Sequence, residues 1–305
     1  MLRGVLAGLA AGALWGLVFV VPRVLAQFSP VDLASGRLAA YGFVATAAMV
    51  LGLRVQRLPT PAQALAAFGL SVLGFWGYYL LLVLAIRDAG VEVPTLVIGT
   101  IPLWVMLLGK PGHLRWTALL PGLLLTALGL ALMVRAQHPE LAATAEAGVG
   151  AADAPHYARG LALAVAAMAS WTAFALLNAA WLKRHPEVNA TEWTNWLGVA
   201  TGIGATGLWL IAGSSAAEIA AQPQRGLFVT LCLATGFGSA WLATVLWTVA
   251  SRRLSPSLCG QLIVSETLFA LLYSYAWDAR WPTAAQSVAA VLFTLGILAS
   301  IRAHR

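Results

Sequence analysis

The chain has little charge. Asp, Glu, Lys and Arg together make up 10% of its 305 residues, whereas about a quarter of an ordinary globular chain is charged. Hydrophobic residues make up 60% of the chain, and the mean hydropathy is +0.83. Such a composition cannot cover a soluble domain with polar surface. It predicts an integral membrane protein, with the lipid bilayer as its surroundings.

Cysteine is scarce as well, and long basic runs are missing. Cys232 and Cys259 both lie within apolar stretches, which favours two small buried side chains over a disulfide. The net charge is +7, yet Lys and Arg stand singly or in pairs and never form a run of five. Nucleic acid is therefore not an expected partner.

Recognisable catalytic motifs are also missing. The sequence contains no HExxH, no nucleophile elbow and no phosphate-binding glycine loop, and its five histidines lie apart from one another. We therefore expect neither enzymatic activity nor a cofactor.

What the chain does contain is a nearly continuous series of apolar stretches. Each is about 20 residues long, which is the length that crosses a hydrocarbon core of about 30 Å. The ten expected transmembrane helices lie at 4–28, 31–53, 62–86, 89–110, 115–135, 159–182, 189–213, 226–250, 255–278 and 281–302. The fold class predicted is an all-α integral membrane protein.

Basic residues divide unequally between the two sides of the expected membrane. With the N-terminus in the cytoplasm, eleven of the 18 Lys and Arg residues fall on the cytoplasmic side and about five on the outer side. Because Lys and Arg accumulate on cytoplasmic loops, this asymmetry predicts that both termini are cytoplasmic.

The two halves of the chain resemble one another. Residues 13–16 (Ala-Leu-Trp-Gly) match 169–172 (Ala-Ser-Trp-Thr), and 85–104 align with 250–269. A unit of five helices has an odd number of passes, so its copy enters the membrane in the opposite orientation. Many secondary transporters place their substrate site near the midplane between such repeats. We expect inverted repeats at 1–137 and 159–305, joined by an external linker at 138–158.

One acidic residue, Glu266, lies near the middle of the expected ninth span. An ion at that depth costs about 2.5 to 3.5 kcal/mol on insertion scales, so such residues usually face protein or a water-filled cavity. Glu266 is interpreted either as a neutral acid that donates a hydrogen bond, or as a group that carries a proton or recognises an amino group.

Arg37 is a cation within the expected second span. It is interpreted as a structural residue, as a partner of Glu92, or as a ligand for a solute carboxylate. These alternatives stay open from the sequence alone.

Prolines and glycines mark unusual helices. Pro94 and Pro102 interrupt the expected fourth span and predict a kink there. The backbone carbonyls that the kink frees either face a cavity or are hydrogen-bonded by neighbouring helices. A face of small residues at intervals of four predicts close helix packing in the first span. That face consists of Gly4, Gly8, Gly12 and Gly16.

Aromatic residues fall at two expected depths. Those at span ends are expected to anchor the chain in the membrane interfaces; they are Trp116, Trp181, Trp193, Trp277 and Trp281. Those deeper in the spans either fill the core or wall a pocket for an apolar or aromatic solute, or for a cation. They are Trp15, Tyr78, Tyr79, Trp104, Trp171, Trp241 and Trp247.

Several of these segments carry a family resemblance. The run ALWGLVFVVPRVL at 13–25, Arg37 with its apolar neighbours, and the stretch from Tyr79 to Pro102 resemble the drug/metabolite transporter superfamily in its EamA-like branch. Residues 246–274 resemble that family's eighth and ninth helices, with Glu266-Thr267 in place of the usual Glu-Pro pair.

The resemblance implies a secondary transporter of the bacterial inner membrane. It implies export of small metabolites, amino acids including aromatic ones, by alternating access through a central cavity, with protons as a candidate coupling ion. Export of hydrophobic amines or drugs, a passive channel and a scaffold are the alternatives. The candidate cavity residues carried over are Trp15, Tyr78, Tyr79, Pro94, Thr95, Trp171 and Glu266.

Overall fold

A computed structural model of the protein describes residues 1–52, 57–89, 92–112, 114–137, 154–279 and 281–304. Within these residues, nine helices are long and apolar enough to cross a membrane, and a shorter apolar helix covers Val97–Leu108. The expectation of an all-helical, multi-pass membrane protein with about ten spans is confirmed.

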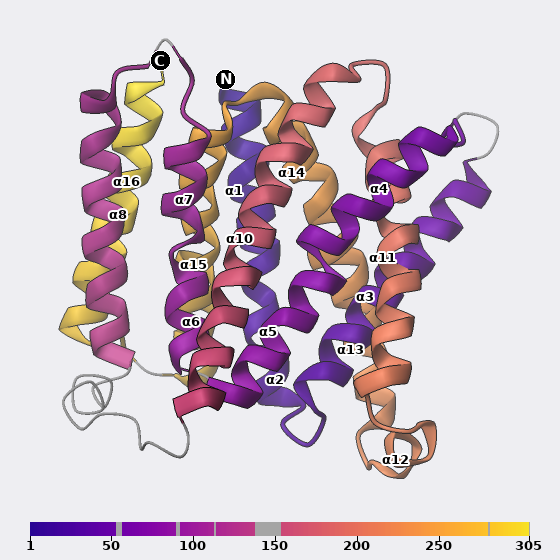
Figure 1. The fold of residues 1–305 in the computed structure, drawn as a ribbon. Coiled ribbons are helices and arrows are strands. Elements are labelled where there is room, and N and C mark those ends of the chain that lie inside the picture. The colour runs from indigo at the N-terminus through magenta and orange to yellow at the C-terminus, as the bar shows by residue number, and fades with distance from the viewer. Residues whose placement is uncertain (53–56, 90–91, 113, 138–153, 280, 305) are drawn as a thin grey trace.

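The first five spans cross the bundle in alternating directions (Figure 1). Their elements are α1 (Leu2–Gly16), η1 (Leu17–Phe19) and α2 (Val21–Val24) in span one, α3 (Pro30–Leu51) in span two, α4 (Pro61–Gly74) and α5 (Trp76–Ala89) in span three, α6 (Glu92–Gly99) and α7 (Ile101–Leu108) in span four, and α8 (Trp116–Gln137) in span five.

The second five spans follow the same plan. Their elements are α10 (Ala154–Arg184) in span six, α11 (Ala190–Ala212) in span seven, α13 (Arg225–Thr235), the π-helix η2 (Gly236–Leu242) and α14 (Ala243–Arg253) in span eight, α15 (Pro256–Asp278) in span nine, and α16 (Ala284–Ala303) in span ten. A short helix, α12 (Ala216–Ala221), precedes span eight. Of the expected linker, 138–153 lies outside the described residues.

Short polar caps fix where the helices begin. Ser29, Thr60 and Ser255 each accept a backbone N–H from the first turn and are followed by proline at the first helical position. Asn189 and Thr283 form reciprocal capping boxes with the residues three places on. These caps satisfy donors that the first turn of a helix leaves unpaired, and a proline there sacrifices no internal hydrogen bond.

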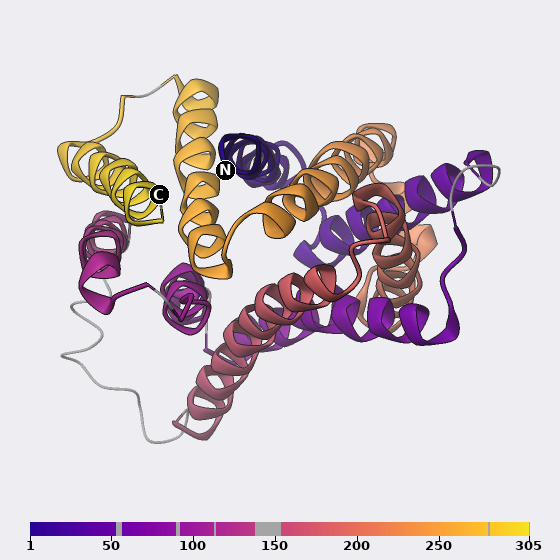
Figure 2. The same cartoon turned by 90° about the horizontal axis from the view of Figure 1, so that it is seen from above.

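Spans of equal rank in the two halves run in opposite directions. Both termini lie at the same end of the bundle, and α1 descends from that end while α10 rises toward it (Figure 1). Helices of equal rank also pack on each other: α3 on α11, α7 on α15 and α8 on α16. Viewed from above, α8 and α16 lie at one edge of the bundle, while α3, α4 and α11 lie toward the other (Figure 2).

Glycine pairs mark two of these crossings. A Cβ added to Gly42 would lie 2.5 Å from the Cα of Gly202, and one added to Gly202 would lie 2.6 Å from the Cα of Gly42. Added Cβ atoms on Gly122 and Gly296 would each lie 3.4 Å from the other's carbonyl oxygen. Such reciprocal contacts are what a two-fold relation between the halves produces. They support the repeat boundaries at 1–137 and 159–305, which stay a proposal.

Spans three and four are each divided into two helices where small residues or prolines permit it. Span four breaks at Thr100, between α6 and α7, with Pro102 in the first turn of α7, as the two prolines predicted. Span three was expected to be continuous but breaks at Phe75, where Gly74 leaves room for the ring of Phe174. Span nine, which lacks the proline after Glu266, runs unbroken as α15.

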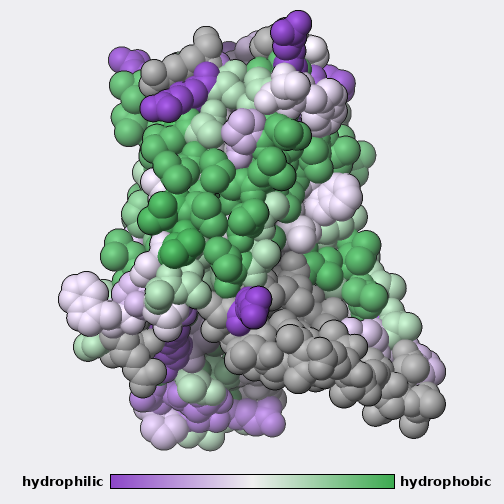
Figure 3. Space-filling view, turned by 90° about the vertical axis from the view of Figure 1, so that its left-hand side faces the viewer, coloured by the Kyte–Doolittle hydropathy of each residue, from purple (hydrophilic) through white to green (hydrophobic). Residues whose placement is uncertain are grey.

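The surface shows a broad apolar belt between polar ends (Figure 3). Trp116, Trp277 and Trp281 are exposed by 55%, 58% and 95%, as expected for interface anchors. The prediction for Trp193 was wrong, because its ring is fully buried, stacks on Trp181 at 3.6 Å and donates a 2.8 Å hydrogen bond to Asn178.

Candidate functional site

Arg37 and Glu266 bring opposite charges into the interior of the bundle. Arg37 lies on α3 and Glu266 on α15, and the two side chains interact electrostatically. Glu266 stands ten residues beyond Pro256, about 15 Å along the helix axis, which is half of a hydrocarbon core of about 30 Å. Glu266 therefore lies near the middle of span nine, and Arg37 stands seven residues, about 10 Å, beyond the start of α3 at Pro30.

The two charges do not close on each other. Among the described residues, the ion pairs within 4.0 Å involve Asp88 with Arg87 and with Arg159, and include neither Arg37 nor Glu266. Both Arg37 and Glu266 keep partial exposure. Neither residue is completely enclosed by the surrounding helices.

Two tyrosines of α5 complete this polar cluster. Tyr78 interacts electrostatically with both Glu266 and Arg37, and Tyr79 does so with Arg37. The hydroxyl of Tyr79 donates a 2.8 Å hydrogen bond to the carbonyl oxygen of Pro30, at the start of α3. Through that bond the broken third span is fixed to the helix that carries Arg37.

The glycine face of α1 positions Glu266. An added Cβ on Gly12 would lie 2.2 Å from the Ser265 hydroxyl oxygen and 3.1 Å from the backbone nitrogen of Glu266, and one on Gly16 would lie 2.8 Å from the backbone nitrogen of Ala270. Packing, the function predicted for these glycines, is confirmed. Because α1 and α15 touch backbone to backbone here, any larger residue on this face would displace the acid.

Trp15 and Trp171 both border one hydrophobic cluster that connects the two halves. The rings of Trp15 and Trp247 are 5.2 Å apart, and those of Trp171 and Phe174 are 6.0 Å apart. Both indoles are only partly buried and pack against the same buried core. The structure thus brings α1 and α10 aromatic residues, predicted from the repeat, to a shared core.

The break in span four meets α10. The Thr100 hydroxyl donates to the carbonyl oxygen of Val97 at 2.6 Å and contacts the Met168 sulfur at 3.2 Å. Pro94 is buried in α6. The side chains of Thr95 and Glu92 lie outside the described residues, so the prediction for Thr95 and the pairing considered for Arg37 with Glu92 stay open.

Two buried amides belong to separate networks. Gln261, fully buried on α15, donates to the Thr126 hydroxyl at 2.8 Å and accepts from Ser300, so it joins spans five, nine and ten. Asn195 accepts a 2.7 Å hydrogen bond from Trp241 in η2. Gln261 is five residues from Glu266 along α15, and five residues of helix rotate its side chain to a different face.

The comparisons with known proteins agree with this architecture. The chain is 29% identical to the inner membrane protein YtfF of Escherichia coli (strain K12), over 99% of this chain and 96% of that protein. A chain of known crystal structure superposes with a TM-score of 0.72 at 21% identity, covering 99% of this chain and 98% of its own, which shows the fold alone.

The family model that matches is described as the EamA-like transporter family, and it covers residues 2–135. That match includes Arg37, both tyrosines of α5 and the broken fourth span. Residues 2–135 are thus similar to the EamA-like transporter family, and nearly the whole chain is similar to an inner membrane protein.

Proposed function

We propose that the protein exports small zwitterionic metabolites, amino acids including aromatic ones, by alternating access through a central cavity. The observation that carries this proposal is the pair Arg37 and Glu266. Opposite charges from α3 and α15 act on each other inside the helical bundle, remain partly exposed, and form no direct ion pair with each other.

The chemistry of an α-amino acid matches that pair. The planar guanidinium of Arg37 suits a carboxylate, to which arginine donates two parallel hydrogen bonds. The carboxylate of Glu266 suits an ammonium group. A zwitterion placed between them would neutralise both charges at a depth where an unpaired charge is costly. A solute that lacks either end would leave one protein charge unpaired, and selectivity follows from that difference.

Aromatic residues supply surfaces for the solute side chain. Tyr78 and Tyr79 belong to the charged cluster, and Trp15 and Trp171 border the adjoining core from opposite halves. Rings stack on rings at offset or edge-on geometry, worth about 0.5 to 1.5 kcal/mol beyond area burial. This favours phenylalanine and tryptophan over threonine as substrates.

An asymmetry in helix packing supports alternating access. α10 packs on α14 and α15, whereas its counterpart α1, in the described part of the chain, makes no comparable packing with α5, α6 or α7. Arg252 at the end of α14 also donates to the carbonyl oxygens of His185 and Val188 beyond α10, at the end that carries the termini. We infer that the bundle is closed at that end, which is the cytoplasmic one. It opens when α10 separates from α14 and α15 and α1 packs instead on α5, α6 and α7.

Counterflow in proteoliposomes tests the proposal. Vesicles loaded with unlabelled phenylalanine are expected to accumulate labelled phenylalanine transiently and with saturation, and the panel is completed by tryptophan, threonine and a cationic dye. A passive channel would equilibrate the label without stimulation from the opposite side. Absence of uptake of every solute would favour a scaffold.

Hydrophobic amines are the second candidate substrate class, favoured by Glu266 standing close to aromatic residues. An amine has no carboxylate for Arg37. Export of a cationic dye that Glu266→Gln abolishes and Arg37→Gln leaves unchanged would therefore assign the protein to amines instead of amino acids.

A further inference from the structure

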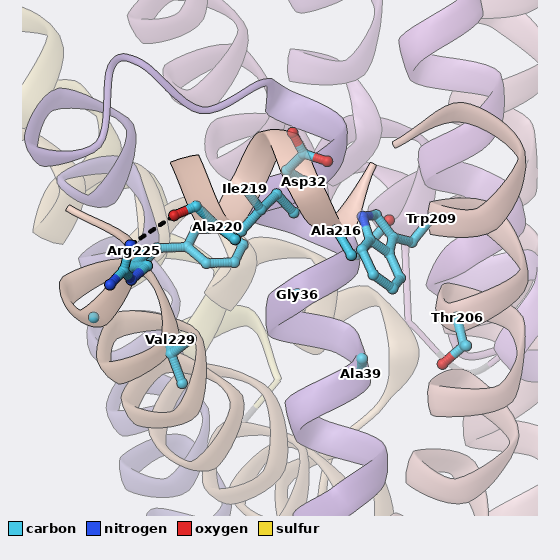
Figure 4. A pocket seen from close by; sticks show the side chains of 13 residues that line it. Asp32, Gly36, Ala39, Thr206, Trp209, Ala216, Ile219, Ala220, Arg225 and Val229 are labelled. Carbon is cyan, nitrogen blue, oxygen red and sulfur yellow. Dashed lines mark hydrogen bonds between the residues drawn. The ribbon is translucent and has the colours of Figure 1, made fainter. Parts of the chain in front are cut away.

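A cavity lies at the side of the bundle, apart from the candidate site. It has a volume of about 660 Å³ and is lined by α3, α11, α12 and α13, and none of the candidate cavity residues lines it. Arg225 lies at one side of this lateral cavity, Trp209 and Thr206 at the other, and Gly36 and Ala39 of α3 between them (Figure 4).

The walls of the lateral cavity are almost entirely apolar. Ile219, Phe228 and Val229 supply hydrocarbon surface, and Val229 is 52% exposed, so the cavity opens where a membrane protein faces lipid. Phe228 is anchored behind it by a stacked contact with Phe28 at 4.4 Å. The lateral cavity is therefore closed by packed aromatic rings on its inner side and open on its outer side.

A shallower groove continues the lateral cavity along the seam between α3 and α11. It has a volume of about 380 Å³ and shares Ala39 and Thr206 with the first. Its two threonines offer the groove no free donor, because the hydroxyls of Thr46 and Thr206 each donate a 2.8 Å hydrogen bond to a carbonyl oxygen of their own helix. Phe43 and Ile203, which flank it, are 67% and 64% exposed.

The lateral cavity and the groove together are about as long as one membrane leaflet is thick. Along α3 they extend from Asp32 to Thr46, which is about 21 Å of helix. Half of a hydrocarbon core is about 15 Å thick, with the headgroup region beyond it. The groove therefore accommodates an extended acyl chain together with the first polar atoms of a lipid.

Among the described lining residues, the charged groups and an unpartnered hydroxyl lie at the outer end. Arg225, at the start of α13, donates one hydrogen bond of 2.7 Å to Ala220, and a guanidinium has five N–H donors. The Ser35 hydroxyl lines the cavity, is 1% exposed and has no hydrogen-bond partner among the described residues. A cation and an unpartnered hydroxyl thus stand where the phosphate and ester groups of a lipid would lie.

The roof of the lateral cavity is fixed in place. Both carboxylate oxygens of Asp32 accept hydrogen bonds from Ser214, at 2.8 and 2.7 Å, and Glu218 accepts the backbone N–H of Ser215 at 2.7 Å. The bonds from Ser214 hold the start of α12 against α3, and the bond from Ser215 caps α12. Because both nearby carboxylates are engaged in this way, Arg225 is the group left to recognise an ion.

We propose that this groove binds one glycerophospholipid of the outer leaflet, with its phosphate on Arg225, its ester region near Ser35 and one acyl chain along the seam between α3 and α11. The occupant follows from the apolar walls open to the bilayer, the leaflet-length groove and the single cation at its polar end. Arginine is the side chain best suited to a phosphate in planar, bidentate geometry.

Native mass spectrometry of the purified, delipidated full-length protein tests this proposal, with palmitoyl-oleoyl phosphatidylglycerol as the titrant. Arg225→Gln removes the phosphate ligand from an exposed position, and Ala39→Leu fills the groove. Arg135→Gln is the matched control, because Arg135 is an exposed arginine at the end of α8 on the same side of the membrane.

The wild type and Arg135→Gln are expected to bind one lipid with equal affinity, and Arg225→Gln to bind it about tenfold or more weakly, since it loses a charged hydrogen bond. Ala39→Leu is expected to weaken binding with an unchanged melting temperature in lipid-free detergent. Equal affinity of Arg225→Gln and the wild type would overturn the proposal, as would full competition by a diacylglycerol with the same chains but no phosphate.

Discussion

In the proposed function, two charges inside the helical bundle determine which solute is recognised. Arg37 and Glu266 come from helices that belong to different halves, yet each falls within the electrostatic reach of the other. A buried charge without a partner is costly, so the site is expected to hold water or a solute of complementary charge. The aromatic residues beside it then decide which side chain the solute carries.

Replacement of the paired tryptophans tests that second role. Trp15→Ala and Trp171→Ala are expected to raise the KM for phenylalanine and tryptophan about tenfold and the KM for threonine far less, because each removes a stacking surface. The measurement is counterflow at varied concentration, with Trp281→Ala as control, since that ring is 95% exposed. Equal KM changes for all three amino acids would contradict the stacking role.

Glu266→Gln tests whether the acid also carries the coupling proton. We expect the variant to lose the response of transport to an imposed pH gradient, since glutamine has no titratable proton. The control is Glu218→Gln on α12, outside the spans, where the backbone N–H and hydroxyl of Ser215 lower the pKa of the carboxyl. An unaltered pH response in Glu266→Gln would leave this acid without a role in coupling.

At the scale of helices, small residues decide where chains cross. α3 and α11 meet at Gly42 and Gly202 because a side chain at either position would collide with the opposing backbone. Without a hydrophobic driving force between helices in lipid, such close approach is what holds spans together.

A pair of substitutions on one helix isolates this effect. Gly202→Ala is expected to lower the melting temperature by several degrees, because overpacking costs about 1 to 3 kcal/mol, while Gly207→Ala, whose added Cβ meets nothing within 4 Å, is expected to leave it unchanged or raise it. Thermal unfolding in detergent measures both. Similar melting temperatures for the two variants would show that the crossing tolerates a methyl group.

The sequence predicted the spans well and the breaks within them only in part. Composition and length locate the apolar spans, and Pro102 predicted the break in span four. The break at Phe75 and the π-helix η2 carry no proline; they depend on how Phe174 packs at Gly74 and on how Trp241 bonds to Asn195. Those are contacts between residues far apart in the chain, which no local pattern encodes.

The same limit applied to the site. Glu266 and Arg37 were noticeable as charges within spans, but their mutual interaction and the contribution of Tyr78 depend on how α3, α5 and α15 meet. Trp193 was misassigned to an interface because its position at a span end gave no sign of its partner Asn178.

At the scale of the molecule, the two halves have equivalent helices but different contacts. α10 packs on α14 and α15, while in the described residues α1 has no comparable partner in α5 to α7. A transporter built from inverted repeats changes its exposed side by exchanging these two contact sets around a site near the midplane. In the proposed function, the conformation described here is the one closed toward the termini.

Thiol labelling tests that assignment. With Cys232 and Cys259 replaced by alanine, Tyr78→Cys is expected to react with a membrane-impermeant maleimide faster from the outer side, and added phenylalanine is expected to slow the reaction. Ala175→Cys, at a position on α10 that is 6% exposed, is the control that should stay unlabelled. Faster labelling of Tyr78→Cys from the cytoplasmic side would contradict the assigned conformation.

Counterflow of phenylalanine by Arg37→Gln, Glu266→Gln and the control Arg135→Gln measures whether one solute bridges Arg37 and Glu266. Loss of one partner of a buried charge pair costs about 2 to 5 kcal/mol, so kcat/KM is expected to fall by about 30-fold or more in the first two variants and to stay unchanged in the third. Phenylalanine counterflow at the wild-type rate in Arg37→Gln would contradict this bridging.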